Sequence, residues 1–84
     1  MTEAGKKLVQ KYLEDEAAGR LLALRNSRNG ELLYGIALEN NNGGQKAAAE
    51  KLVREGYGEM QWSRSLGSHR GRYFWLTPEG RKKL

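Results

Sequence analysis

The 84-residue sequence carries a formal net charge of +5, is 38% hydrophobic and 30% charged, and contains no cysteine. This composition is typical of one small soluble domain and excludes disulfide and thiolate-metal frameworks. No apolar run approaches the roughly 20 residues of a membrane span, and the N-terminus lacks the apolar core of a signal peptide, so a cytoplasmic location is expected.

The first third of the chain carries a helical pattern. Apolar residues recur there at spacings of three and four positions: Val9, Leu13, Ala17, Leu21 and Leu24. This spacing is typical of one face of an amphipathic helix, so residues 1–26 are expected to form an N-terminal helix, or two helices divided at Gly19.

The segment at residues 31–39 fits two different elements. Four of its apolar residues share one face of a short helix: Leu32, Leu33, Ile36 and Ala37. Another four alternate as in a strand: Leu32, Tyr34, Ile36 and Leu38. Asn29-Gly30, just before the segment, is a recognised hairpin signal, yet the local pattern leaves helix and strand both open.

A second helix is predicted after the turn of asparagine and glycine at residues 40–44. Both residue types tolerate the left-handed backbone angles of turns, and the helix-forming sequence QKAAAEKLVREG follows. Its inward face is expected to consist of four apolar residues: Ala48, Ala49, Leu52 and Val53. Gly56 is placed to end this helix with a left-handed cap.

Two aromatic-rich strands are predicted next, at YGEMQWS and RYFWL, separated by the basic segment RSLGSHRG. This spacing predicts a β-hairpin with a loop longer than a tight turn. After it, Thr77 can cap a short helix, with Pro78 at the first helical position and Glu79 in the first turn.

The excess positive charge lies in the C-terminal half. The first 40 residues contain six Lys or Arg and six Asp or Glu, whereas residues 41–84 contain nine and four. This asymmetry indicates a polyanionic partner that is bound by the C-terminal half. A surface charged only for solubility is the alternative.

Two stretches of the C-terminal half resemble a known family. EKLVREGY, residues 50–57, resembles the end of the recognition helix in winged helix-turn-helix regulators of the MarR and PadR kinds, with Leu52, Gly56 and Tyr57 in the family's places. GRYFWLTPEGRKKL, residues 71–84, is similar to the closing strand and following helix of the same family. The residues that match there are Arg72, Tyr73, Phe74, Leu76, Thr77, Pro78, Glu79, Gly80 and Arg81. The resemblance covers residues 47–84.

The resemblance implies an α+β fold, a small winged helix-turn-helix domain in which helices are followed by a C-terminal β-hairpin wing. The expected parts of this one domain over residues 1–84 are an N-terminal helix or helices at 1–26, a helix-turn-helix at 31–56, a wing hairpin at 57–76 and a C-terminal helical turn at 77–84. Such regulators usually dimerise through long terminal helices, and a homodimer through the N-terminal helix is one option here.

The resemblance also implies a function, the sequence-specific binding of double-stranded DNA by a small transcriptional regulator. The recognition helix would lie in the major groove and the basic wing on the backbone or in the minor groove. Two alternatives stay open: a winged-helix module that binds another protein, and a binder of RNA or single strands that stacks bases on Trp62, Trp75 and Tyr73. At alternating strand positions beside a small core, however, tryptophans are more often packing residues.

The candidate DNA contacts come from the second helix and the hairpin. The helix and the turn before it contribute Asn42, Gln45, Lys46, Lys51 and Arg54. The hairpin contributes Arg64, Ser68, His69, Arg70 and Arg72. Gln45 can pair with adenine, whereas Lys46 can reach guanine acceptors or phosphate. No nucleophile with a base, no metal-ligand set and no phosphate loop is visible, so neither enzymatic activity nor a cofactor is expected.

Overall fold

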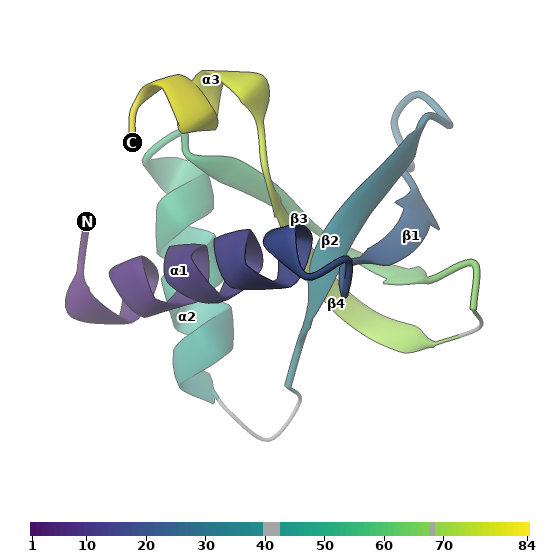
Figure 1. Ribbon diagram of the computed structural model, residues 1–84, viewed down its shortest axis with the longest axis horizontal. Helices are drawn as coiled ribbons and strands as arrows, with labels where there is room; N and C mark the ends of the chain where they lie inside the picture. Colours follow the sequence, from purple (N-terminus) through teal and green to yellow (C-terminus); the bar gives the residue numbers. More distant parts are fainter. Residues whose placement is uncertain (40–42, 68) are drawn as a thin grey trace.

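The structure is a computed structural model that describes residues 1–39, 43–67 and 69–84 (Figure 1). Its elements follow one another in this order: α1 (Glu3–Ala17), β1 (Leu22–Arg25), β2 (Leu32–Leu38), α2 (Gly43–Arg54), β3 (Gly58–Arg64), β4 (Arg70–Leu76) and α3 (Pro78–Lys82). The strands form one antiparallel sheet in the order β1-β2-β4-β3. The expected α+β class is therefore confirmed. No helix in the described part of the chain is both long and apolar enough to span a membrane.

Helices α1 and α2 cross each other and pack beside the sheet (Figure 1). Helix α1 buries Leu8, Val9 and Tyr12. The Tyr12 ring meets the ring of Phe74 on β4 edge-on, with 6.3 Å between the two centroids. Leu52 of α2 is buried in the same core. Removal of these apolar side chains from water is the main stabilising contribution to the fold.

Helix α1 ends earlier than the sequence pattern predicts. Its last residue is Ala17, and Gly19 follows with a left-handed φ of 70°. The backbone N–H of Arg20 donates to the Asp15 carbonyl at 2.7 Å, as in a glycine-terminated helix end. The expectation of helix up to residue 26 is therefore wrong, because the chain turns at Gly19 and then pairs as β1 with β2.

Residues 31–39 contain a strand, so the first helix of the expected helix-turn-helix at 31–56 is absent and that part of the prediction is wrong. Residues 32–35 of β2 pair with β1 and residues 36–38 pair with β4, so each part of the strand has a backbone partner. Gly35 allows a close approach here, because a Cβ atom at this position would lie 2.8 Å from the Phe74 carbonyl oxygen. The hairpin signal at Asn29-Gly30 marks the turn, where the Asn26 N–H donates to the Glu31 carbonyl at 2.8 Å.

The expected helix ends in the C-terminal half are confirmed. Helix α2 is closed by Gly56, and the N–H of Tyr57 donates to the Leu52 carbonyl at 2.9 Å. Thr77 caps α3, since its Oγ1 accepts the Gly80 N–H at 3.0 Å, and Pro78 occupies the first turn.

The β3–β4 hairpin is not a free two-stranded wing. The β1–β2 turn (residues 26–31) folds over one of its faces and is held there by Gln61. The Gln61 Nε2 donates to the Arg25 carbonyl, and its Oε1 accepts the Ser27 N–H, both at 2.9 Å. The Leu66 N–H donates to the Ala23 carbonyl at 2.9 Å, which ties the hairpin loop to β1. One face of the hairpin is therefore already occupied by the rest of the chain.

Candidate nucleic-acid interface

The structure separates the residues predicted to contact DNA into two groups. Helix α2 and the loop at the end of the β3–β4 hairpin lie on opposite sides of the molecule in Figure 1. The α2 group consists of Gln45, Lys46, Lys51 and Arg54. The hairpin group consists of Arg64, His69, Arg70 and Arg72. Asn42 and Ser68, which the sequence also favours, lie outside the described residues.

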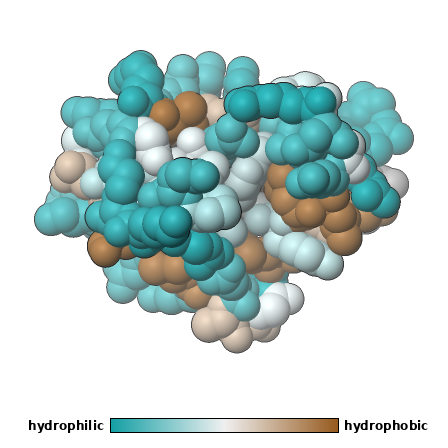
Figure 2. Space-filling model, turned by 90° about the horizontal axis from the view of Figure 1, so that it is seen from above, coloured by the Kyte–Doolittle hydropathy of each residue, from teal (hydrophilic) through white to brown (hydrophobic). Residues whose placement is uncertain are grey.

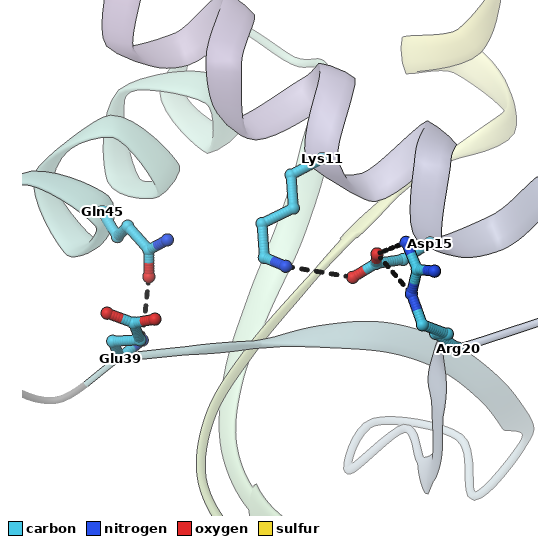
Figure 3. Close-up of polar contacts among 5 residues, drawn as sticks. All are labelled: Lys11, Asp15, Arg20, Glu39 and Gln45. Carbon is cyan, nitrogen blue, oxygen red and sulfur yellow. Dashed lines mark hydrogen bonds and ion pairs between the residues drawn. The ribbon is translucent and has the colours of Figure 1, made fainter. Parts of the chain in front are cut away.

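The α2 group carries mixed charge on an exposed surface. Lys46, Lys51 and Arg54 are exposed, but so is Glu50, which lies four residues from both Lys46 and Arg54 and thus on the same stripe of the helix. Gln45 is only partly exposed, because its Oε1 accepts the backbone N–H of Glu39 at 2.9 Å (Figure 3). Gln45 therefore connects the end of β2 to the first turn of α2.

The hairpin group is brought together by the register of β3 and β4. Arg64 lies directly opposite Arg70, and Trp62 lies directly opposite Arg72. Residues directly opposite in antiparallel strands, and residues two positions apart along one strand, share a face. The four side chains therefore form one surface, which we call the basic hairpin face (Trp62, Arg64, Arg70 and Arg72).

On this side of the hairpin, the helices cover only the part next to the core, beyond the four residues of the basic hairpin face. Phe74, two residues after Arg72, lies on the same face and is fully buried beneath Tyr12 of α1. The hairpin then extends past the end of α1 (Figure 1), and Arg64 and Arg70 are exposed. The opposite face is the one that Gln61 fastens to the β1–β2 turn. The basic hairpin face is thus the side of the hairpin that is open to a partner.

The arginines of this face lack an acidic partner among the described residues, whereas several other basic side chains have one. Lys11 and Arg20 both contact Asp15, at 3.2 and 2.9 Å (Figure 3). Hydrogen bonds from these two side chains, with Arg20 the larger influence, lower the pKa of Asp15. Like charges directly opposite in a sheet repel each other, so a bound anion would relieve the Arg64–Arg70 pair.

Trp62 is the residue of this face that strand alternation fails to identify. Strand alternation predicts that both tryptophans are packing residues. This prediction is confirmed for Trp75, which is 7% exposed, and is wrong for Trp62, which is 61% exposed. The Arg72 guanidinium lies over the Trp62 ring, 5.7 Å from its centroid. Tyr73 is fully buried. Of the aromatic residues proposed as stacking platforms, only Trp62 is accessible to a base.

The hairpin loop is closed by its own backbone contacts. The Ser65 N–H donates to the His69 carbonyl at 2.8 Å, and the His69 N–H donates to Ser65 Oγ at 3.0 Å. The Tyr73 hydroxyl also donates to the His69 carbonyl. The backbone of His69 thus holds the loop together, while the residue as a whole is exposed. Among the described residues, no group of three Asp, Glu or His side chains is placed to hold a metal ion.

The N-terminal helix, the expected dimer surface, serves first as part of the core. Its outer side still lines an apolar groove, whose apolar residues are Met1, Val9, Leu13, Ala17 and Leu84. On the face seen in Figure 2, apolar groups lie in separate patches among hydrophilic side chains. The homodimer stays a prediction.

Several residues that carry the family resemblance have packing roles here, whereas Arg72 lies on the basic hairpin face. Leu52 is buried, Gly56 ends α2, and Thr77 caps α3. A Cβ atom at Gly80 would overlap the Tyr57 carbonyl oxygen, so only glycine fits where α3 meets the start of β3. Arg81 forms an ion pair with Glu16 and lies over the Tyr12 ring. These contacts account for the motif without a partner.

In comparisons with known proteins, no family model, no curated protein and no solved structure matches the chain.

Proposed function

We propose that the protein binds nucleic acid, as a small DNA-binding regulator, and that the basic hairpin face is its main contact surface. The observation that carries this proposal is the placement of Arg64, Arg70 and Arg72 on one open face, where none of them forms an ion pair with an acidic side chain in the described part of the chain. A protein that keeps such a repulsive arrangement loses a little stability, which is expected when the site serves an anionic ligand.

Arginine suits this role because its guanidinium group is planar, always charged and able to donate two parallel hydrogen bonds to one phosphate. Contacts with phosphate release the counterions condensed on the nucleic acid, and this release gives the affinity a steep dependence on salt. The hairpin face would therefore supply most of the affinity, with no preference for one base sequence.

Helix α2 is proposed as the second contact surface on duplex DNA. Its exposed Lys46, Lys51 and Arg54 are available to phosphate or base edges. Two elements support the winged-helix proposal: helix α2 and the hairpin that follows it. Because β2 occupies the place of the first helix of a helix-turn-helix, α2 would approach the major groove without that preceding helix, and the helix packed beside it is α1.

The proposal is tested by fluorescence anisotropy of a labelled mixed-sequence duplex titrated with the protein at about 50 and 200 mM salt. If the three arginines each neutralise one phosphate, the plot of log K against log salt falls with a slope of about −3. Binding that is absent at the lower salt concentration, or that is present with no slope, would remove the proposal.

A further inference from the structure

We infer that Trp62 stacks on an unpaired base, so that the basic hairpin face binds single-stranded nucleic acid more tightly than fully paired duplex. This inference rests on the proposed function and names the form of nucleic acid that the face accepts best. It starts from one exposed indole ring within a group of three arginines.

The position of Trp62 in the sheet leaves room for a base. Strand β3 is the edge strand of the sheet, so no further strand pairs with it on the side away from β4, and Trp62 lines a hollow there together with the β1–β2 turn. The side chain is 61% exposed, and the contact of its ring in the structure is the Arg72 guanidinium, 5.7 Å from the centroid. A large aromatic ring that is exposed on an edge strand is accessible to a partner.

The charges around Trp62 are placed for the backbone of a strand whose base stacks on the ring. Arg64 lies two residues further along β3, about 7 Å away at the spacing of an extended strand. Arg72 lies directly across from Trp62, and Arg70 directly across from Arg64. Arginines on two sides of the ring can contact the phosphates on either side of the stacked base, and Arg72 adds a cation–π contribution.

Duplex DNA cannot use this arrangement fully. The faces of a paired base are covered by its neighbours in the helix, so Trp62 finds no ring to stack on and only the arginines contribute. Base stacking on an aromatic side chain raises affinity by about 5-fold or more per base. Because Tyr73 and Trp75 are buried, this gain is expected from one base only.

The test compares affinities for short oligomers of equal length: single-stranded poly-dT, single-stranded poly-U and a mixed-sequence duplex. The variants are Trp62→Ala, which removes the ring, and Trp62→Phe, which keeps an aromatic surface. Because Trp62 is exposed, both variants are expected to fold, and thermal melting checks this. Intrinsic fluorescence reports on stacking directly, since Trp75 is buried and the Trp62→Phe variant shows the Trp75 contribution alone.

The expected result has three parts. Single strands quench the emission of the native protein but not that of Trp62→Phe, Trp62→Ala weakens single-strand binding by about 5-fold or more, and duplex binding changes little in either variant. Equal affinity of dT and U oligomers then shows that the ring reads base faces, whereas tight binding of U alone, with the same loss in Trp62→Ala, adds a contact to the ribose hydroxyl.

Two outcomes overturn the inference, and they can be told apart from failure of the proposed function. Equal binding of duplex and single strand, with no effect of Trp62→Ala on either, removes the stacking role and leaves salt-dependent binding by the arginines intact. Equal weakening of both forms by Trp62→Ala makes Trp62 a general contact residue and likewise overturns the inference, because stacking on an unpaired base would then not be the source of a single-strand preference. If the duplex does not bind at about 50 mM salt, the proposed function itself fails, whatever the single strands do.

Discussion

Helix α2 and the β3–β4 hairpin carry the same kinds of side chain but place them in different surroundings. On α2 the basic residues share their stripe with Glu50, and Gln45 is engaged by the backbone of Glu39. On the hairpin, strand pairing collects Arg64, Arg70 and Arg72 from separate positions onto one face that holds no acidic residue. The difference teaches that charge counted along a sequence does not locate a binding surface. We propose that charge that the fold leaves without compensation is the better guide to such a surface.

The largest effect is expected from a double substitution on the hairpin, which is compared with a matched double substitution on α2. Arg64→Ala with Arg70→Ala removes two charges from the hairpin, and the control, Lys51→Ala with Arg54→Ala, removes two from α2. The hairpin variant is expected to lower duplex affinity by about tenfold or more and to reduce the salt slope by about two units. Anisotropy titrations at several salt concentrations measure both. If the α2 variant loses as much, the two surfaces contribute equally and the proposed ranking is wrong.

A second substitution tests whether the Gln61 side chain holds the β1–β2 turn against the hairpin. Gln61→Ala leaves the Ser27 N–H and the Arg25 carbonyl without their partner and is expected to lower the free energy of unfolding by about 1 kcal/mol. Ser63→Ala, on the same face of β3, is the control and is expected to change it by less than about 0.5 kcal/mol. Thermal melting compares the two variants. Equal stability would mean that the β1–β2 turn is held without Gln61.

Neighbouring residues of α2 distinguish a structural role from a binding role. Gln45→Ala removes the acceptor for the Glu39 N–H and is expected to cost about 0.5–1.5 kcal/mol of stability. Lys46→Ala is expected to leave stability unchanged within about 0.5 kcal/mol and to alter affinity or the preference among DNA sites. Chemical denaturation and anisotropy on several sequences separate the two effects. A Gln45→Ala variant that is fully stable and has altered sequence preference would return Gln45 to the base-contacting residues.

The features that were predictable from the sequence are those decided within a few residues. The caps at Gly56 and Thr77 follow from local backbone preferences and are present. The strand at residues 32–38 depends on a partner far along the chain, because β4 pairs with it. A local pattern cannot contain that information. Gly19 likewise divides a helix from a strand, although the leucine spacing continues across it.

For the candidate site, the sequence identified the arginines but not their arrangement. The pairing of Arg64 with Arg70 and of Trp62 with Arg72 depends on the register of the hairpin, which its loop sets. The contact that fixes the hairpin joins Gln61 to residues 34 and 36 positions away, so no spacing rule reveals it. Of the motif residues shared with the regulators, Leu52, Gly56, Thr77 and Gly80 have packing or capping roles and indicate local structure more than DNA binding, whereas Arg72 lies on the basic hairpin face.

The smallest expected effect concerns stability and not binding. Arg70→Ala removes one of two like charges that face each other across the hairpin, so it is expected to raise the free energy of unfolding by a few tenths to about 1 kcal/mol at low salt. The gain should vanish at about 1 M salt, where charges are screened within about 3 Å. Arg54→Ala is the control, because Glu50 lies four residues before it and the loss of an attractive pair should leave stability equal or slightly lower. Melting temperatures of the two variants at low and high salt measure this difference.

A gain in stability in Arg70→Ala but not in Arg54→Ala would mean that the native hairpin is less stable because of the residue that is proposed to bind phosphate. No gain would mean that the two guanidinium groups stay apart even without an anion. The proposal that the hairpin binds nucleic acid would then lose the argument from repulsion and rest on the exposure of these arginines and their lack of acidic partners among the described residues.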